Sequence, residues 1–166
     1  DLINAQNTKP GQAVIGIPSS GFHSNGFSLI RKVLSDENIS LDNEFNGETL
    51  GEALLRPTRI YAKEVRSLLE NVKVSGISHI TGGGFIENLP RALKKGLGMK
   101  IYRDSYEIPE IFKFIEEKGQ IDHDEMYQVF NMGVGLAVIV DDADKDKVLD
   151  LIDDAFILGE VTDKEG

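Results

Sequence analysis

The stretch AVIGIPSSGFHSNGFSLIRKVL (residues 13–34) places a strand pattern, a polar loop and a helix pattern in immediate succession. Ala13 to Ile17 is a short apolar run rich in β-branched residues, which is typical of a buried strand. Phe27 to Leu34 has apolar residues at helical spacing. The segment 18–26 between them is rich in Gly, Ser and Asn, so it forms a loop that leads directly into a helix N-terminus.

The same alternation continues along the chain. Further strands are predicted at 77–81, 99–102, 133–140 and 156–161, and helices at 50–55, 59–71, 108–117, 122–130 and 144–154. Thr58 is expected to cap the second of these helices, and Gly76 to separate it from the next strand. Helical sequence from Gly84 to about Lys95 contains Pro90, so that helix either begins late, with Asn88 as its cap, or is kinked. Alternating strands and helices predict a layered α/β or α+β domain, whose strand order cannot be read from sequence.

Composition narrows the class of protein. At 166 residues the chain has the size of one domain, which we expect to span residues 1–166. The absence of Cys excludes disulfides and thiol nucleophiles, and no apolar run is long enough to cross a membrane. A net charge of −10 argues against a nucleic-acid partner. With no signal-peptide pattern at the first residues, we expect a soluble cytoplasmic protein without membrane contact.

The acidic charge is unevenly distributed. No Asp or Glu occurs between Asp1 and Asp36, and Glu87 is the only acid from Asn71 to Arg103. These two acid-poor stretches could meet in space as a pocket for an anion. The alternative is that strands and tight loops simply avoid charge.

The first loop has the composition of an anion site. Hydroxyls and free backbone N–H groups at a helix N-terminus suit a phosphate, and His23 could donate a charge-assisted hydrogen bond or transfer a proton. Ser24 or Asn25 could also cap the helix. The Walker pattern is absent. In the alternative interpretation, the Ser and Asn side chains satisfy their own backbone. The predicted binding residues are Ser19, Ser20, Gly21, Ser24, Asn25 and Gly26, with His23 as the catalytic candidate.

The second loop contains three consecutive glycines, Gly82, Gly83 and Gly84. A fold keeps such a triplet where a side chain would collide, with either a ligand or a neighbouring backbone. Glu87 and Asn88 follow as candidate substrate contacts. Glu87 could bind a hydroxyl, an amine or Mg²⁺, or could instead pair with Arg91 four residues later. His79, on the preceding strand, is more simply a core histidine.

Other positions give weaker indications. Arg59 at a helix start could face an anionic ligand, although a surface Arg is the simpler explanation. Gly133 and Gly135 allow a close approach of backbone to a neighbour. The acidic cluster 141–146 lacks the central Gly and closing Glu of an EF-hand, so no metal ligands are predicted in this chain.

Together these segments resemble the C-terminal domain of the phosphoribosylformylglycinamidine cyclo-ligase family, also called aminoimidazole ribonucleotide synthetases. The segments that carry the resemblance are IPSSGFHSNGFSL (17–29), LLRPTRIY (54–61), HITGGGFIENLPR (79–91) and FNMGVG (130–135), which occur in order over almost the whole chain. The glycine triplet with its continuation to Arg91 is specific to this family within its superfamily.

The resemblance implies an ATP-dependent enzyme of purine biosynthesis that closes an imidazole ring. Family members use ATP and Mg²⁺, act on an anionic ribonucleotide, form homodimers and place the active site between two domains. The implied fold is α+β with α/β/α layers, a mixed β-sheet with flanking helices and partial ferredoxin-like topology.

The N-terminal domain of the family, which forms the dimer and supplies most Mg²⁺ and nucleotide ligands, is absent from this sequence. We therefore expect an excised domain that is inactive alone but retains a phosphate site on the first loop. Whether that loop binds the phosphate of the substrate or of ATP stays open. The alternatives are a domain of a related ATP-dependent enzyme, of the amidotransferase, selenophosphate synthetase or thiamine phosphate kinase type, or a non-catalytic ligand-binding or dimerisation module.

Overall fold

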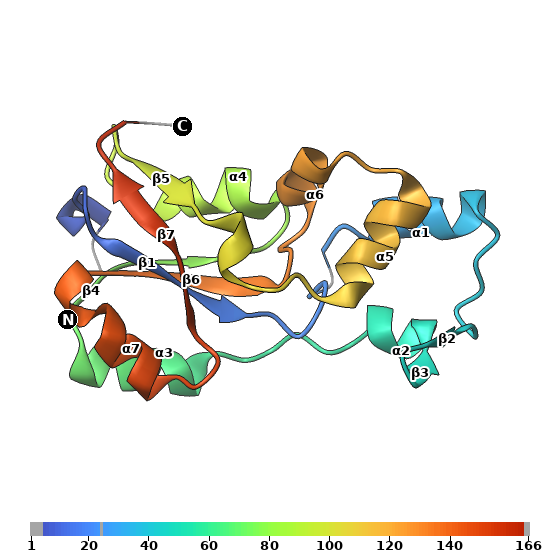
Figure 1. Cartoon of the computed structure of the whole chain (residues 1–166), viewed down its shortest axis with the longest axis horizontal. Coiled ribbons are helices and arrows are strands. Elements are labelled where there is room, and N and C mark those ends of the chain that lie inside the picture. The colour runs from blue at the N-terminus through green and yellow to red at the C-terminus, as the bar shows by residue number, and fades with distance from the viewer. Residues whose placement is uncertain (1–4, 24, 165–166) are drawn as a thin grey trace.

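A five-stranded sheet organises the protein. A computed structural model describes residues 5–23 and 25–164. The strands lie in the order β4-β6-β1-β7-β5 (Figure 1). They are β1 (Ala13–Pro18), β4 (Val74–His79), β5 (Gly98–Ile101), β6 (Val134–Val140) and β7 (Phe156–Thr162). Every residue of β6 is buried, as expected for the apolar run predicted there.

Helices cover both faces of the sheet. The α-helices are α1 (Phe27–Asp36), α2 (Leu50–Leu54), α3 (Ala62–Asn71), α4 (Gly84–Asn88), α5 (Glu110–Gly119), α6 (His123–Val129) and α7 (Lys145–Leu151). Short 3₁₀ turns are η1 (Ala5–Asn7), η2 (Leu89–Ala92), η3 (Arg103–Ser105) and η4 (Asp142–Asp144). Figure 1 shows α3 and α7 together beneath the sheet and α4 above it, so the expected α/β/α layering is present.

The two faces bury separate clusters of apolar side chains, and alternation along β1 assigns its residues to them. Ile15 and Ile17 pack toward α3 and α7, in a cluster that includes Leu68 and Val148. Val14 points to the opposite face, where a larger cluster joins the sheet to α1, α2, α4, α5 and α6. Alternate residues of β1 therefore contact opposite layers of helices.

The topology confirms the α+β class and corrects one detail of it. Strands β1, β4, β6 and β7 with helices α3 and α7 have the ferredoxin-like order, and β5 extends the sheet beside β7. The sheet is not mixed, because every described strand pair is antiparallel. The reason is that each crossover skips one position: β6 lies between β1 and β4, and β1 lies between β6 and β7.

Several helices and strands begin or end at residues other than those predicted. The helix expected from Arg59 begins only at Ala62, so Thr58 does not cap it. Gly76 lies inside β4, at an irregularity opposite Ile139, rather than in a break. α4 ends at Asn88, and Pro90 lies in the first turn of the tighter η2, which Asn88 precedes as N-cap. The helical sequence thus begins at Gly84 and tightens before Pro90.

A small hairpin was not predicted in the polar segment 38–49. Strands β2 (Glu44–Phe45) and β3 (Glu48–Thr49) pair there around Asn46 and Gly47, which both have positive φ. Asn-Gly is the usual sequence of such a two-residue turn. Thr49 and Glu52 then form a capping box at the start of α2.

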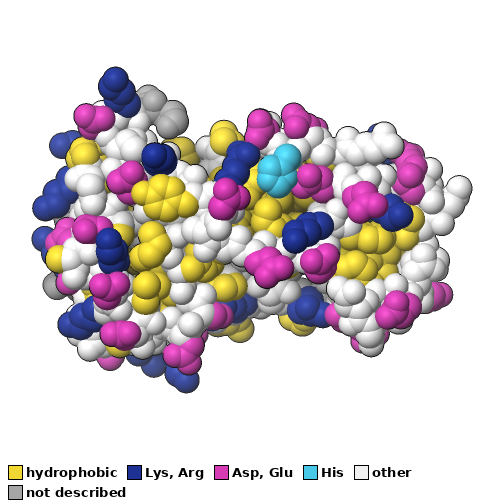
Figure 2. All heavy atoms as spheres, in the orientation of Figure 1, with side chains coloured by type: hydrophobic (Ala, Val, Ile, Leu, Met, Phe, Trp, Pro, Cys, Tyr) yellow, Lys and Arg dark blue, Asp and Glu magenta, His cyan; other side chains and the backbone are white. Residues whose placement is uncertain are grey.

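Figure 2 shows several Lys and Arg side chains along the left edge, where β4 begins in Figure 1, with Asp and Glu side chains among them. In the described part of the chain, no helix is both long and apolar enough for a membrane span.

Candidate functional site

The first loop folds around His23. The imidazole is 6% exposed, and its backbone has a positive φ of 55°. Its Nε2 atom accepts hydrogen bonds from the backbone N–H of Ser20 at 2.9 Å and of Arg59 at 3.3 Å. His23 therefore ties its own loop to the segment that precedes α3.

These contacts fix the protonation state of the ring. Because Nε2 accepts two N–H groups, the proton of the neutral ring resides on Nδ1. Nδ1 is buried and has no hydrogen-bond partner among the described residues. Burial, then the proximity of His79 and of the Arg59 guanidinium, lowers the pKa of His23 from 6.5 to about 4. The lowered pKa favours a neutral ring, whereas a charge-assisted hydrogen bond from His23 would need the protonated one.

Two more aromatic side chains stand beside His23. Ring centroids of Tyr61 and His79 lie 6.3 Å and 6.4 Å from the His23 ring. Tyr61 is buried and donates from its hydroxyl to the Pro18 carbonyl at 2.7 Å. His79 is exposed at the end of β4, so its prediction as a core histidine was wrong.

Gly135 makes this arrangement possible. A Cβ on Gly135 would overlap the Tyr61 hydroxyl and come within 3.0 Å of Cε1 of His23. The predicted close approach of backbone near Gly135 is therefore confirmed, and the neighbour is the aromatic cluster.

Arg59 is used within the protein. Its Nη1 atom donates to Asp154 at 2.8 Å and to the Pro18 carbonyl at 3.0 Å. The guanidinium is half-buried and joins the end of β1 to the segment after α7. Its positive charge is thus already paired with a carboxylate.

Asn131 holds the first loop from the other side; the sequence placed it in the FNMGVG segment but indicated no role for its side chain. Its side chain is 1% exposed. Its Oδ1 accepts from the Ser19 hydroxyl at 3.0 Å and from the Gly133 N–H at 2.8 Å, while its Nδ2 donates to the Gly21 carbonyl at 2.8 Å. A polar residue directly before the glycine-containing turn 132–133 was the available signal.

Much of the first loop's hydrogen-bonding capacity is satisfied internally. Besides the N–H of Ser20, that of Ser19 donates to Gly133 at 2.9 Å and that of Asn25 to Phe22 at 3.0 Å. The Ser20 hydroxyl donates to the Pro57 carbonyl. Gly26, with φ of 76°, is the N-cap of α1, and Asn25 instead donates from its side chain to the His23 carbonyl. Ser24 lies outside the described residues. This pattern agrees in large part with the alternative of a self-satisfied loop.

The second loop meets the first. A Cβ on Gly82 would lie 3.8 Å from the Asn25 Oδ1, so the two glycine-containing loops are neighbours at this end of the sheet. Gly83 and Gly84 both have positive φ, and a Cβ on Gly84 would overlap the Tyr127 carbonyl. Among the described residues, the N–H groups of Gly82 and Gly83 have no hydrogen-bond partner.

Asn88 shapes this second loop from inside. Its Nδ2 donates to the carbonyls of Gly84 at 2.8 Å and of Gly82 at 3.2 Å, and its Oδ1 accepts from the Thr81 hydroxyl at 3.1 Å. The Asn88 side chain is 1% exposed, so these hydrogen bonds are buried and stabilise the conformation of the loop.

Glu87 is exposed and pairs with Arg91 at 2.9 Å, which is the salt bridge that its spacing allowed. In the described residues no three carboxylate or imidazole side chains are grouped to hold a metal ion. With Glu87 and Asp154 both paired to arginines, this end of the sheet does not fit a Mg²⁺ site.

The two acid-poor stretches meet through their glycine loops but not through their cations. Lys73 directly precedes β4, whose far end carries His79, and Lys94 bonds to Thr8 near the N-terminus. The donors at this end of the sheet that lack a described partner, the N–H groups of Gly82 and Gly83 and Nδ1 of His23, are therefore neutral, and we call them the strand-end site.

Comparisons with known proteins give the class first. Residues 9–166 match the family described as "AIR synthase related protein, C-terminal domain". Because the match covers nearly the whole sequence, the chain belongs to that family.

Curated relatives define the branch of the family. The phosphoribosylformylglycinamidine cyclo-ligase of Oceanobacillus iheyensis is 47% identical, over 99% of this chain and 50% of the relative. The protein of the same name from Lachnospira eligens is 49% identical, over 97% of this chain and 49% of the relative. The chain thus spans about half the length of these relatives, and the resemblance to the cyclo-ligase C-terminal domain is confirmed.

Solved structures share the fold. E. coli HypE, a hydrogenase maturation protein, matches with a TM-score of 0.66 at 20% identity, over 99% of this chain and 48% of HypE. T. maritima PurL, solved with AMPPCP, matches with a TM-score of 0.51 at 14% identity, over 98% of this chain and 23% of PurL. At such identities the likeness concerns the fold alone.

Proposed function

We propose that this chain is the C-terminal half of an ATP-dependent cyclo-ligase of de novo purine biosynthesis. The enzyme converts formylglycinamidine ribonucleotide to aminoimidazole ribonucleotide, ADP and phosphate. The main support is sequence identity of 46–49%, over almost the whole chain, to relatives that are named as this cyclo-ligase. Those names favour the cyclo-ligase over an amidotransferase or a selenophosphate synthetase.

The reaction needs positioning more than covalent help. ATP transfers its terminal phosphoryl group to the formamide oxygen, and ADP leaves. The substrate's own nitrogen then attacks the activated carbon, the ring closes, and the carbon–oxygen bond breaks to release phosphate. Oriented hydrogen-bond donors stabilise the charge that develops on oxygen in such steps.

The two strand-end loops are our proposed location for the anionic ribonucleotide. The unused N–H groups of Gly82 and Gly83 and the Nδ1–H of His23 are the donors we assign to it. His23 is the proposed catalytic residue, acting as a neutral donor. Asn88 and Asn131 act as positioning residues, because their buried side chains determine the shape of the two loops.

The remaining requirements fall to the other half of the enzyme. The described residues offer no carboxylate cluster for Mg²⁺. As the family resemblance implies, we assign Mg²⁺ and most of the ATP contacts to the N-terminal half. A homodimer in the cytoplasm, with the active site closed between the two halves, completes the proposal.

Reconstitution tests the proposal. The N-terminal half of the Oceanobacillus iheyensis relative is joined to this chain, and formation of aminoimidazole ribonucleotide is measured with ATP, Mg²⁺ and the substrate. We expect turnover by the joined protein and none by this chain alone. A folded joined protein that releases no product, or normal turnover by this chain alone, would contradict the proposal.

A substitution in the same protein tests the role of His23. His23→Asn keeps a residue that tolerates positive φ but removes the imidazole donor. We expect kcat to fall about a hundredfold, as for loss of one oriented donor. His123→Gln, on α6 and bonded to Glu116 rather than to either loop, is the matched control and should leave kcat unchanged.

A further inference from the structure

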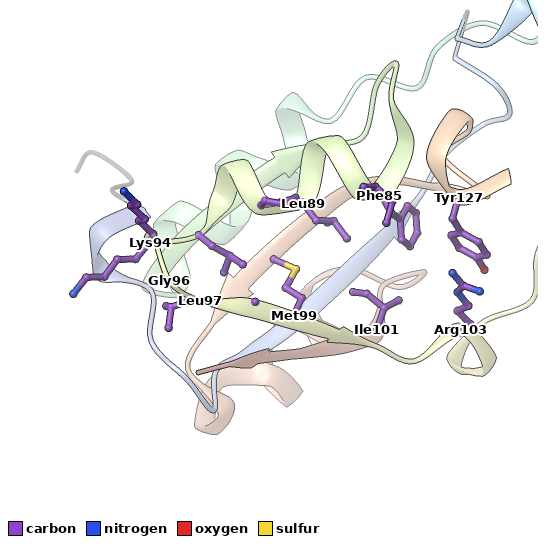
Figure 3. Close-up of a pocket in the computed structure, with 14 residues that line it drawn as sticks. Phe85, Leu89, Lys94, Gly96, Leu97, Met99, Ile101, Arg103 and Tyr127 are labelled. Carbon is purple, nitrogen blue, oxygen red and sulfur yellow. The ribbon is translucent and has the colours of Figure 1, made fainter. Parts of the chain in front are cut away.

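A hollow lies along the outer side of β5, next to the glycine loop. Its volume is about 480 Å³. Figure 3 shows Phe85 and Leu89 on one wall, Met99 and Ile101 on the facing wall, and Lys94 at one end. We call this hollow the β5 groove. It begins directly after Gly84, so it continues the surface of the strand-end site.

The β5 groove is apolar and open. Leu97, Met99 and Ile101 are only half-buried, and Ile86 at its border is 63% exposed. A contiguous apolar hollow of this kind is typical of a surface that binds another molecule. In addition, β5 is the last strand of the sheet, so its outer edge pairs with no other described strand. Such an edge offers backbone N–H and C=O groups to an extended segment.

The location of the N-terminal segment indicates the occupant. Thr8 is buried, and its hydroxyl accepts a hydrogen bond from the Lys94 backbone N–H at 2.8 Å. The N-terminal end of the described chain therefore lies beside Lys94, at one end of the groove. The curated relatives carry about as much sequence again as this chain contains. A domain tethered at that point would reach the groove at high effective concentration.

The charged residues at the edge of the β5 groove indicate what charge its occupant should carry. Lys94 and Lys95 are exposed and form no ion pair with a described carboxylate, whereas Arg103 at the other end is paired with Asp124 at 2.7 Å. An occupant with apolar side chains and acidic residues opposite Lys94 and Lys95 would match this pattern.

We propose that the β5 groove is the docking surface for the N-terminal half of the same polypeptide. This inference rests on the proposed two-half organisation, but not on the reaction. In this proposal the N-terminal half covers the groove whether or not nucleotide is bound.

Amide hydrogen exchange, measured on this chain joined to an N-terminal half, tests this inference. The N-terminal half of the Oceanobacillus iheyensis relative is joined to this chain, and amide exchange is compared with that of this chain alone, without ATP or substrate. We expect exchange of the amides in β5 and η2 to slow by about tenfold or more in the joined protein.

Two variants locate the contact. Met99→Glu places a charge in the groove, and the double change Lys94→Glu with Lys95→Glu reverses the border without touching the core. Both should abolish the added protection. The matched control, Lys63→Glu with Arg66→Glu on exposed positions of α3, should preserve it.

Equal exchange rates in the joined protein and in this chain alone would overturn the proposal. Protection that appears in this chain alone as its concentration rises would assign the groove to a second copy, and protection only after addition of ATP or substrate would assign it to a ligand. Both results overturn the proposal as well. Failure of the cyclo-ligase assay with protection intact would instead contradict only the proposed function.

Discussion

The buried His23 makes the stability of the fold depend on pH in a calculable way. In the folded chain its pKa is about 4, against 6.5 for an exposed histidine. Since the unfolded state binds the proton at higher pH, the free energy of unfolding decreases as pH falls below about 6.5. One pKa unit corresponds to about 1.4 kcal/mol, so His23 alone lowers this free energy by about 2 kcal/mol between roughly pH 8 and pH 5.

Urea unfolding monitored by circular dichroism measures this effect, because the chain has no Trp for fluorescence. Working above the pI of about 4.7 keeps the protein charged. His23→Asn should be less stable at high pH, but its stability should fall by about 2 kcal/mol less than that of the parent chain over this range. If the curves of the parent and of His23→Asn stay parallel, His23 is not a buried neutral ring and the assignment of its Nδ1–H donor is wrong.

Three further substitutions test the loops through the free energy of unfolding, measured in urea, and each cost below is a loss of that free energy. Asn88→Ala should cost about 2–3 kcal/mol, because it leaves buried carbonyls of the glycine loop unpaired; a cost below about 0.5 kcal/mol would exclude it as a brace. Gly26→Ala should cost about 3 kcal/mol or more, because its φ is positive and the new Cβ would overlap the Phe130 ring, whereas Gly11→Ala, with positive φ but nothing within 4 Å, should cost only about 1 kcal/mol. Asn131→Asp should cost about 2 kcal/mol, since it loses the donor to the Gly21 carbonyl; an unchanged midpoint would show that the brace is dispensable.

Local patterns were sufficient for most elements of the fold. The apolar run at 133–140 and the strand–loop–helix at 13–34 predict β6, β1 and α1 to within two residues at each end. The segment before α3 was misjudged because Arg59 and Tyr61 both donate hydrogen bonds to the Pro18 carbonyl, which holds them outside the helix. The antiparallel order of the sheet depends on which strands are skipped by each crossover, and that is a property of tertiary packing.

The sequence located both loops but not the way they work. Their residue types suggested a ring of serine hydroxyls and amides around an anion, whereas several of those groups are bonded within the protein. Asn131 bonds to residues more than one hundred positions away, and His23 accepts from Arg59, 36 positions away, so no local spacing records these contacts.

An NMR titration with formylglycinamidine ribonucleotide tests the central claim most directly. The backbone amides of Gly82 and Gly83 and the Nδ1 of His23 are followed in the joined protein as the ribonucleotide is added. These signals should shift together and saturate, while amides of α7 on the opposite face of the sheet stay unchanged. Saturable binding that leaves all three signals unmoved would place the ribonucleotide elsewhere and contradict the assignment of these loops.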